Sequence, residues 1–434
     1  MNAPSVEVIE TEEGFDRLRR DWDRLFVADG RSVFQSFEWL RAWWRHFGEG
    51  DARRELHIAL VVVDVVSEVP RRPQRLIVGI APFFIERTRA FGVVGVRRLA
   101  FLGRPVSDYL DIIAAPAHRA VVVDALAQHL SDTAHAWDVC VLEDITERSP
   151  TATALQAALS SLGITATRFA NERCPRTVLQ GTWAETLAAL KGDHRRELQR
   201  RRRKLEKHAP VELEIAGDAA SIDADLEQFI AMHQEHWTSM GHTGALADTR
   251  AQRFHRDAAA AMAARGWTFM AFLRVHGRRV AVVYGFRFNN ELAIYLTGAR
   301  HESPELRQLS TGRVLASLVM EHATTSSLQA YDFMRGTEGY KYELGGVDVA
   351  NQTLIIEGQR SWFSARRHRA GLLHEALLRR GEHERALWEH ATGRASPLSS
   401  TSTAHVRARL GVVWRDGLRK LKHPERSLSA ELPH

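Results

Sequence analysis

The amino-acid sequence predicts an α/β fold built from two similar halves, each a mixed and mostly antiparallel sheet flanked by helices. Segments rich in Val, Ile and Phe alternate along the chain with segments whose apolar residues recur at helical spacing. Both halves also share one order of elements: helices, two or three antiparallel strands, a polar loop, one helix and one strand. The two halves share this order of elements but have no similar amino-acid sequence. We expect domains at residues 1–175 and 176–365, followed by a basic helical tail at 366–434.

The first half begins with amphipathic helices and continues with strands. Apolar residues at helical spacing predict one helix in GFDRLRRDWDRLF, and Ser36 is placed to cap a second one, FEWLRAWWRHF. The aromatic residues of both helices are typical of a core. Later strands are expected at 56–66, 75–86, 96–102, 109–114, 137–142 and 165–169, and helices at 119–130 and 152–162.

The second half carries the clearest sheet signal. Three strands are expected at 267–275, 279–288 and 291–297, because the tight-turn sequences His276-Gly277-Arg278 and Asn289-Asn290 separate them. The remaining predicted elements are helices at 192–208, 224–240, 249–264 and 313–323, a strand opening at Tyr331, a further strand at 353–360, and tail helices at 361–388 and 405–422.

Composition excludes several classes of protein. Apolar residues make up 44% and charged residues 26% of the chain, which is ordinary for a soluble globular protein. Two cysteines, Cys140 and Cys174, are too few for a disulfide framework or a four-cysteine zinc site. The N-terminus lacks the basic and then apolar pattern of a signal peptide, and Asp64 interrupts the best apolar run, at 58–66. We therefore expect a cytoplasmic protein without a transmembrane segment.

The segment at 192–208, GDHRRELQRRRRKLEKH, predicts a basic helix. Its arginines and lysines nearly surround it, and Leu198 and Leu205, one heptad apart, form a thin apolar stripe that can dock. A solvated helix is the plain interpretation. Nucleic-acid binding would need interleaved aromatic residues or a second basic element, so we expect no specific nucleic-acid partner. A positive wall near an anionic substrate fits the pattern better.

The loop before the helix at 313–323 is a candidate phosphate site. A helix N-terminus carries unpaired N–H groups and a partial positive charge. Ser310 and Thr311 add hydroxyl groups, and Gly312 lets a ligand approach the backbone closely. An ordinary capped helix is the alternative. Neither the P-loop pattern nor G-x-G-x-x-G occurs, which disfavours a nucleoside triphosphatase or a dinucleotide enzyme. Cationic donors for a diphosphate would be Arg300, Arg307 and Arg313.

The segment at 330–346, AYDFMRGTEGYKYELGG, concentrates chemically active side chains. It begins as a strand with Tyr331 and Phe333 on one face and then delivers Tyr340 and Lys341 close together. Ligands of open α/β sheets gather at strand ends. A surface turn lined by these side chains is the alternative.

These segments together resemble the GNAT acyltransferase superfamily. More narrowly, they are similar to the CelD-like acetyltransferases associated with cellulose or exopolysaccharide biosynthesis, which are akin to the Fem aminoacyltransferases. The first half is similar to the degenerate partner domain of that branch. The family usually has Ser-Pro-Gly where this chain has Ser310-Thr311-Gly312, so the fixed backbone angle of a proline is missing. The resemblance covers about 187–346 and is carried by GDHRRELQRRRRKLE, FIAMHQEHWTSMGHTGALAD, RHESPELRQLSTGRVLASLVMEHA and DFMRGTEGYKYELG.

The resemblance implies an N-acyltransferase that uses acetyl-CoA or another acyl-CoA and no metal. The acceptor would be an amine, for example on an amino sugar or a polysaccharide precursor. Its proton must be removed, strand N–H groups must stabilise the thioester oxygen, and the thiolate must leave. The implied cofactor-binding residues are Arg300, Leu309, Ser310, Thr311, Gly312 and Arg313; Asp332 or Glu343 would take the proton, Tyr340 would donate to the thiolate, and His233, Trp237, Arg335 and Lys341 would contact the acceptor.

For His233 and Trp237, packing in the core is the alternative to contact with the acceptor.

Two other functions also fit the sequence. One is a non-catalytic assembly protein that keeps the fold and holds an acidic partner, or contacts a membrane surface, through its basic helices. The other is a Fem-like aminoacyltransferase that uses charged transfer RNA, although long paired helices of an inserted arm are not evident in the sequence.

Overall fold

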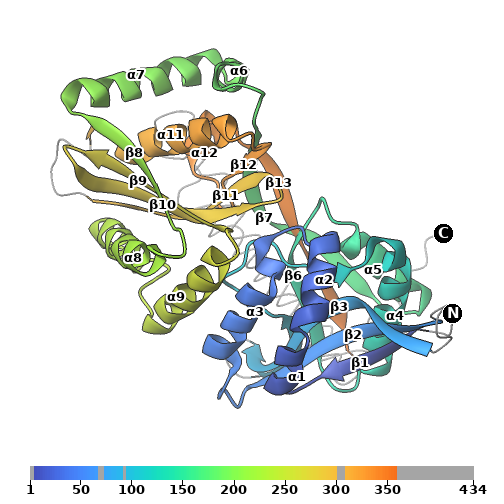
Figure 1. Ribbon diagram of the computed structural model, residues 1–434. Helices are drawn as coiled ribbons and strands as arrows, with labels where there is room; N and C mark the ends of the chain where they lie inside the picture. The colour runs from blue at the N-terminus through green and yellow to red at the C-terminus, as the bar shows by residue number, and fades with distance from the viewer. Residues whose placement is uncertain (1–3, 67–72, 91–93, 301–307, 359–434) are drawn as a thin grey trace, which may run out of the picture. The chain divides into compact units, whose positions relative to one another are not determined.

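A mixed sheet of thirteen strands runs through the protein (Figure 1). The computed structural model describes residues 4–66, 73–90, 94–300 and 308–358. The predicted helical tail at 366–434 and the start of its first helix lie outside these residues. None of the described helices is both long enough and apolar enough to span a membrane.

The first half begins with a strand, β1, that was not expected from the sequence, and then follows the predicted order of helices and strands. Ser36 caps α3 as predicted, because its side chain accepts a hydrogen bond from the Trp39 N–H at 3.3 Å. Trp22, Trp39 and Trp43 are fully buried in the core, as expected for the aromatic residues of these helices. The elements are β1 (Ser5–Ile9), α1 (Glu12–Arg17), α2 (Arg19–Asp29), α3 (Phe37–Trp43), β2 (Arg54–Val66), β3 (Pro73–Ala90), β4 (Val94–Phe101), β5 (Ile113–Ala114), α4 (Arg119–Asp132), β6 (Val139–Thr146), α5 (Thr151–Ser161) and β7 (Ala166–Val178).

The second half contains the three predicted antiparallel strands and the helices around them. Leu198 and Leu205 are the buried residues of α7, so the predicted apolar stripe is confirmed. The elements are α6 (Trp183–Ala189), α7 (Gly192–His208), β8 (Val211–Ala216), α8 (Ile222–Ser239), α9 (Thr249–Ala263), β9 (Thr268–Val275), β10 (Arg278–Phe288), β11 (Glu291–Ala299), α11 (Thr311–Thr325), β12 (Ala330–Asp332), α12 (Gly339–Glu343) and β13 (Val347–Glu357).

The strand order joins the two halves into one sheet. β13, from the end of the second half, lies between β6 and β7 of the first half and is antiparallel to both. β7 in turn pairs through its last residues, Arg176–Val178, with β12 of the second half. Each half therefore supplies a strand that borders the other. The full order is β1-β2-β3-β4-β6-β13-β7-β12-β11-β10-β9-β8, with β5 paired to β3.

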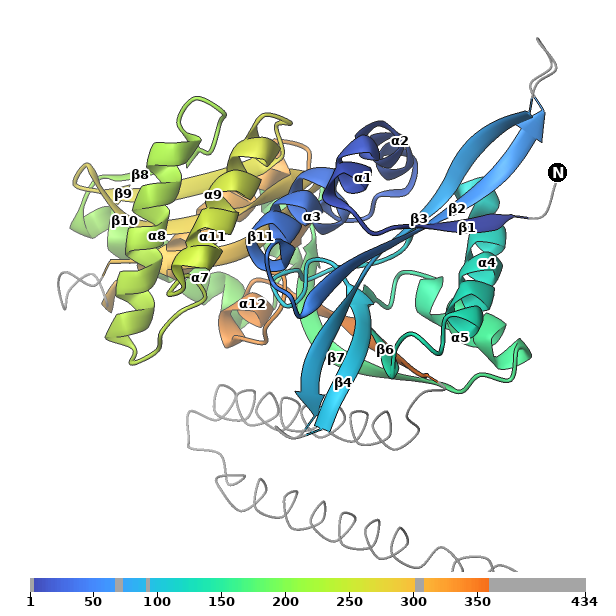
Figure 2. The ribbon, with the colours of Figure 1, turned by 90° about the horizontal axis from the view of Figure 1, so that it is seen from below.

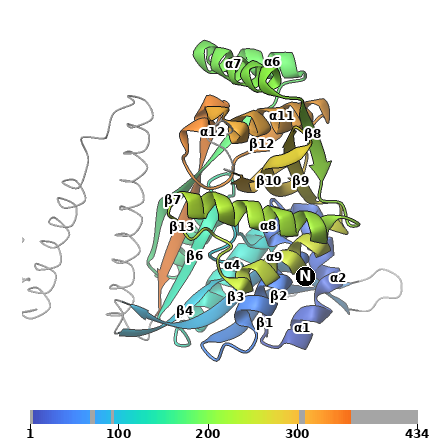
Figure 3. The same cartoon turned by 90° about the vertical axis from the view of Figure 1, so that its left-hand side faces the viewer.

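Helices cover both faces of the sheet in the second half. α11 packs on one face with α7 outside it, and α8 and α9 pack on the other (Figures 1 and 3). Side chains alternate accordingly along β9: Phe269 and Ala271 join the core under α11, whereas Met270 joins the core under α8 and α9.

The core under α8 and α9 continues into the first half. α3 lies against α9 (Figure 2), and the rings of Trp39 and Phe254 are 4.8 Å apart. A single apolar core thus connects the first half to the face of the second half that carries α8.

Four predicted elements differ clearly from the structure. The strand expected at 165–169 continues as β7 to Val178, where it pairs with β12. The strand expected at 109–114 is reduced to Ile113–Ala114, because the polar residues before it bond to the second half instead of to a strand. The segment around Tyr340 is a short helix and not a strand end. The strand expected at 353–360 begins earlier, at Val347, where it meets β7. In each case tertiary contacts override the local pattern.

Candidate functional site

β11 and β12 separate from one another and open a slot in the sheet. Their parallel pairing covers Glu291–Ala293 of β11 only, although β11 continues to Ala299. The register of β10 against β11 shifts at this point, since Tyr284 faces Leu296 while Gly285 faces Ile294. Such a bulge bends a strand and often lies beside a functional site. Among the described strands, none therefore pairs with the second part of β11 on the β12 side.

Gly285 is required by this bulge. A Cβ at this position would lie 2.0 Å from the Ala293 carbonyl oxygen, so a larger residue would push the two strands apart. Gly298 plays a similar part on β11, because its Cβ would lie 2.8 Å from the His233 backbone nitrogen. The two glycines therefore set the path of β11 and the close approach of α8 to it.

A cavity of about 180 Å³ occupies the slot. Its lining comes from both faces of the sheet, with residues of α8 on one side and of α11 on the other. Tyr331 and Tyr340 contribute from the β12 side. The cavity therefore runs through the opening between the strands. The lining residues that matter for the chemistry are His236, Thr297, Gly298, Gly312, Arg313 and Tyr340.

The α11 N-terminus lies at one end of this cavity. The N–H groups of Arg313 and Val314 bond to the Ser310 carbonyl, at 3.0 and 3.1 Å, so the helical bonding starts there. A helix leaves the N–H groups before this point without an intrahelical acceptor, and its dipole adds positive charge. Among the described residues, no atom lies within 4 Å of a Cβ built on Gly312, so this part of the chain leaves space beside the first turn. The described residues therefore leave this end of the helix accessible to an anion.

The six residues expected to hold the donor lie in different surroundings. Gly312 and Arg313 line the cavity. Ser310 precedes the first turn in a left-handed conformation, while Leu309 and Thr311 are buried beside it. Arg300 does not line the cavity; it lines a separate pocket at the turn between β9 and β10. The structure thus gathers five of the six at the start of α11 and places Arg300 apart.

α12 carries three of the predicted residues, Tyr340, Lys341 and Glu343, and of these Tyr340 lines the cavity. The Tyr340 ring packs 6.0 Å from Phe333, edge to face. Glu343 lies within ion-pair distance of two arginines, with 3.2 Å to Arg201 and 3.7 Å to Arg313. The phenol therefore faces the slot, whereas the carboxylate is held between α7 and α11.

The Lys341 side chain is buried and binds the loop between β12 and α12. Its ammonium nitrogen donates to the carbonyl oxygens of Met334, Arg335 and Gly336, at 3.3, 2.7 and 3.3 Å. Three carbonyl oxygens satisfy the three donors of an ammonium group. The side chain thus closes the loop between β12 and α12 and holds the neighbouring Tyr340 in place.

Asp332 faces away from the slot. Alternation along β12 places it opposite Tyr331, which lines the cavity. Its Oδ2 accepts from the Tyr109 hydroxyl at 2.8 Å and its Oδ1 accepts from the Met334 N–H at 2.7 Å. Burial raises the pKa of Asp332 to about 7.

Arg335 belongs to the same buried network. Its guanidinium lies 2.9 Å from Asp108 and 3.2 Å from Asp144, and it donates to the Ser107 carbonyl at 2.6 Å. Burial raises the pKa of Asp144 to about 6. Asp332 and Arg335 therefore tie the β12 loop to the first half, and the structure does not bring them to the cavity.

His233 is buried between α8 and β11. Its Nδ1 lies 2.7 Å from the Thr297 carbonyl oxygen, and burial lowers the pKa of the imidazole, so the neutral ring donates from Nδ1. Trp237 packs 6.0 Å from the His233 ring. Neither residue lines the cavity. His236 does line it and was not predicted from the sequence; the signal was its spacing of three residues from His233, which makes the two neighbours on α8.

Comparisons with known proteins place these features in a family context. Residues 192–342 match the family model described as an acetyltransferase (GNAT) domain. A search of curated proteins found no match. Among solved structures, FemX is similar with a TM-score of 0.52 at 10% identity, covering 80% of this chain and 96% of FemX. This likeness shows a shared fold.

Two further solved structures are similar at lower scores. One is the C-terminal domain of a putative lysylphosphatidylglycerol synthetase from Agrobacterium fabrum, with a TM-score of 0.46 at 10% identity over 80% of this chain and 92% of that one. The other is a tandem GNAT protein from the clavulanic acid biosynthesis pathway, with a TM-score of 0.42 at 12% identity over 82% of this chain and 99% of that one. The match to the GNAT family model and the observed mixed sheet flanked by helices confirm the predicted GNAT-like fold.

Proposed function

We propose that this chain, which contains a GNAT domain at residues 192–342, is an acyltransferase that moves the acyl group of an acyl-CoA to an amine. One observation carries the proposal. The cavity between β11 and β12 connects the open N-terminus of α11 with His236 and Tyr340. An extended ligand with an anionic group at one end and a reactive group at the other fits such a slot.

The donor would enter at α11. Its diphosphate would accept hydrogen bonds from N–H groups of the first turn around Gly312, and Arg313 would add a guanidinium donor. The thioester arm would follow the free edge of β11, whose backbone N–H groups lie where no described strand takes them. An N–H group in this position stabilises the oxyanion that forms when the thioester carbonyl is attacked.

The acceptor would approach from the side of α8, where His236 lines the cavity. The amine nitrogen attacks the thioester carbon, the carbon–sulfur bond breaks, and the amine proton passes to the His236 imidazole. The Tyr340 hydroxyl gives its proton to the departing thiolate. We favour His236 as base because Asp332 lies on the other face of β12 and Glu343 is held by two arginines.

The finer features of the proposal come from the resemblance of the motifs to the CelD-like acetyltransferases. They are acetyl-CoA as donor, an amine on a sugar or a polysaccharide precursor as acceptor, and a cytoplasmic site of action. A Fem-like aminoacyl transfer remains the alternative donor chemistry, and the same slot would then hold a different acyl carrier.

Calorimetry with acetyl-CoA and coenzyme A tests the donor site, and release of free thiol in the presence of a panel of amines, glucosamine included, tests the transfer. We expect binding in the micromolar range that is typical of enzyme substrates. If neither ligand binds at millimolar concentration, acyl-CoA is not the donor.

A His236→Gln variant tests the base. We expect kcat to fall by about 10²–10⁴-fold, because a positioned proton acceptor contributes that much, while the KM for acyl-CoA changes little. The control is His135→Gln, which alters an exposed histidine of the first half. Unchanged kcat in His236→Gln would remove this residue from the mechanism.

A further inference from the structure

We propose that a pocket at the C-terminal ends of α9 and α11, which we call the α9–α11 pocket, binds an α-amino acid with an apolar side chain. The pocket has a volume of about 280 Å³ and shares no lining residue with the slot between β11 and β12. The inference needs no acyl transfer, so it stands or falls independently of the proposed function. The lining residues that carry the inference are Ile215, Asp218, Phe269, Arg287, Leu292 and Leu328.

The pocket begins where β8 stops pairing with β9. The last paired residue of β8 is Ala216, opposite Met270, although β9 starts at Thr268. Gly217 follows with a φ of +93°, and a Cβ on it would lie 3.0 Å from the Met270 nitrogen. A residue other than glycine would therefore be strained here. The pairing of β8 and β9 ends at this point, and Thr268 and Phe269 line the pocket.

The floor of the pocket is apolar. The side chains of Phe269 and Leu292 are buried, and Leu328 adds a third apolar side chain after α11. Ile215 of β8 is 45% exposed, so a ligand that covers it removes apolar surface from water. The volume is just below the range of about 300–1,000 Å³ for pockets that hold drug-sized ligands. A ligand of the size of a single amino acid therefore suits this pocket.

Asp218 and Arg287 are the charged residues among the described lining of the pocket. Neither forms an ion pair with the other or with any other side chain that the structure describes. The Asp218 carboxylate accepts from the N–H groups of Ala220 and Ser221, at 2.9 and 2.8 Å. The bond from Ser221 contributes most to lowering the pKa of Asp218, so the carboxylate is ionised near neutral pH. The pocket therefore offers one negative and one positive group to a ligand.

His322 adds a ring to the pocket without a charge. This ring stacks on Phe269 with the centroids 6.0 Å apart. Burial lowers the pKa of His322, so the imidazole is neutral near pH 7. The charges of the described lining therefore balance. A neutral lining with separate positive and negative groups suits a ligand that itself carries both charges.

An α-amino acid meets each of these conditions. Its carboxylate would accept paired hydrogen bonds from the Arg287 guanidinium, and its ammonium group would donate to Asp218. Its side chain would cover the apolar floor and Ile215. A simple carboxylate or a simple amine would leave one of the two charged residues without a partner.

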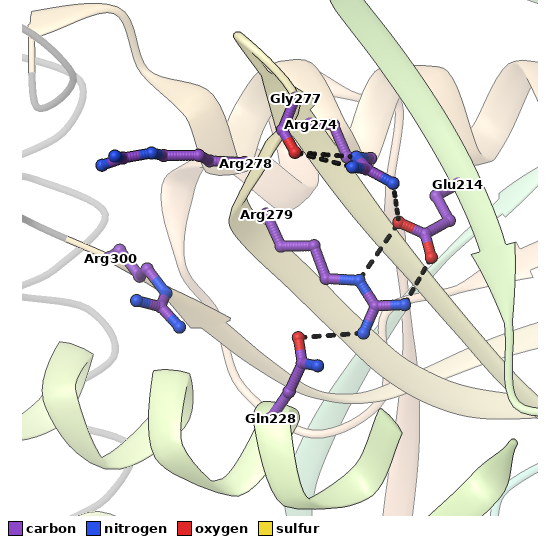
Figure 4. A pocket seen from close by; sticks show the side chains of 7 residues that line it. All are labelled: Glu214, Gln228, Arg274, Gly277, Arg278, Arg279 and Arg300. Carbon is purple, nitrogen blue, oxygen red and sulfur yellow. Dashed lines mark hydrogen bonds and ion pairs between the residues drawn. The ribbon is translucent and has the colours of Figure 1, made fainter. Parts of the chain in front are cut away.

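The pocket at the turn between β9 and β10 is built differently (Figure 4). There the Glu214 carboxylate pairs with Arg279 and lies 3.5 Å from Arg274. Arg279 also donates to the Gln228 amide oxygen at 3.0 Å. The protein itself thus supplies the partners of this carboxylate. In the α9–α11 pocket the carboxylate and the guanidinium do not pair with one another, which is why we assign the ligand to this pocket.

Calorimetry with L-leucine and the full chain, in the absence of acyl-CoA, tests the proposal. Three analogues are compared with it: isocaproate lacks the amino group, isopentylamine lacks the carboxylate, and glycine lacks the side chain. We expect L-leucine to bind, and each analogue to bind at least about tenfold more weakly, because each loses one charged or apolar contact. No binding of L-leucine at millimolar concentration, or equal binding of any one analogue, would overturn the proposal.

Two variants locate the binding site. Arg287→Gln and Asp218→Asn should each weaken L-leucine binding about 10–100-fold, since each removes one hydrogen-bonded charge. Asparagine keeps an oxygen for the N–H groups just before α8, so the start of this helix is preserved. The matched controls are Arg253→Gln and Asp124→Asn, which remove the same charges at exposed positions outside the pocket and should bind like the wild type. If Arg287→Gln or Asp218→Asn binds L-leucine like the wild type, the ligand lies elsewhere and the proposal fails.

Discussion

Ser310, the residue directly before α11, has a φ of +53°, in the left-handed conformation that costs a residue other than glycine about 1–2 kcal/mol. Its side chain makes no capping bond to the helix. No capping hydrogen bond from the Ser310 side chain therefore offsets this strain. Strained backbone of this kind is often found at ligand sites. The Ser310 conformation turns the chain so that Gly312 and Arg313 line the slot. We propose that an anionic ligand bound at this terminus offsets the strain.

Gly312→Glu tests this proposal. A side chain at this position meets no atom of the described residues within 4 Å at its Cβ, and glycine inside a helix costs about 1 kcal/mol relative to a good helix former, so the free energy of unfolding should stay constant or rise. The added carboxylate should repel the diphosphate and weaken acyl-CoA binding at least about tenfold. Calorimetry and urea unfolding measure the two quantities.

The matched control for this variant is Gly312→Gln, which has nearly the same size without the charge. Its acyl-CoA affinity should lie between those of the wild type and Gly312→Glu. If the two variants weaken binding equally, bulk and not charge is responsible, and the helix N-terminus is not the anion site.

At the residue scale, some of the residues that line the candidate site could be predicted from the sequence. Gly312, Arg313 and Tyr340 were expected in one site, and the cavity is lined by all three. Helix starts and strand ends are local features, so their residues can be recognised from spacing. Asp332 and Arg335 were different, because their side chains bond to Tyr109 and Asp108, which lie more than two hundred positions away in the sequence. No local pattern reveals such a partner.

At the scale of elements, the loop from β12 to α12 is held from two sides. Lys341 binds its carbonyl groups from within, and the buried ion pairs of Arg335 with Asp108 and Asp144 attach it to the first half. Removing one partner of such a network leaves an uncompensated buried charge. The position of Tyr340 at the slot therefore depends on contacts that involve both halves. The sequence predicted a strand end here because it showed the polar residues but not their distant partners.

Asp332→Asn tests the protonation state of this network. The pKa of Asp332 is about 7 in the folded protein, against an ordinary aspartate value of 3.8 for the unfolded chain, so the folded state binds the proton more tightly. Its contribution to stability is therefore fully present below the unfolded pKa and is lost as pH rises through 7. We expect the wild type to lose roughly 2 kcal/mol relative to Asp332→Asn between pH 5 and pH 8.

Urea unfolding of both proteins across this pH range measures the difference. Asp144, whose pKa is raised in the same direction, is present in both proteins and cancels. Asp124→Asn, which changes an exposed carboxylate on α4, should follow the wild type at every pH. A stability gap between the wild type and Asp332→Asn that is constant with pH would mean that Asp332 is ionised in the fold.

At the scale of the molecule, β7 and β13 connect the two halves. The domain boundary expected from the sequence, between residues 175 and 176, falls inside β7, and β13 runs between β6 and β7. The sequence pattern predicted two halves with a similar succession of elements, and in the structure the strands of both belong to one sheet. It could not reveal which half each late strand would join, because an apolar strand such as Leu354–Ile356 fits the interior of either sheet. The first half is therefore complete only when the end of the second half has folded.

Ile356→Ala tests this dependence. Ile356 is fully buried, pairs with Cys140 of β6 and Ala166 of β7, and its truncation should lower the free energy of unfolding by about 2–5 kcal/mol. Val347→Ala is the control, because Val347 belongs to the same strand but is 70% exposed, and it should cost less than about 0.5 kcal/mol.

Hydrogen exchange of peptides from β3 and β10 reports on the two halves separately. If the halves form one cooperative unit, protection in both falls together in Ile356→Ala. Loss of protection in β3 with unchanged protection in β10 would show that the second half is stable alone, and that the shared strand serves only the first half.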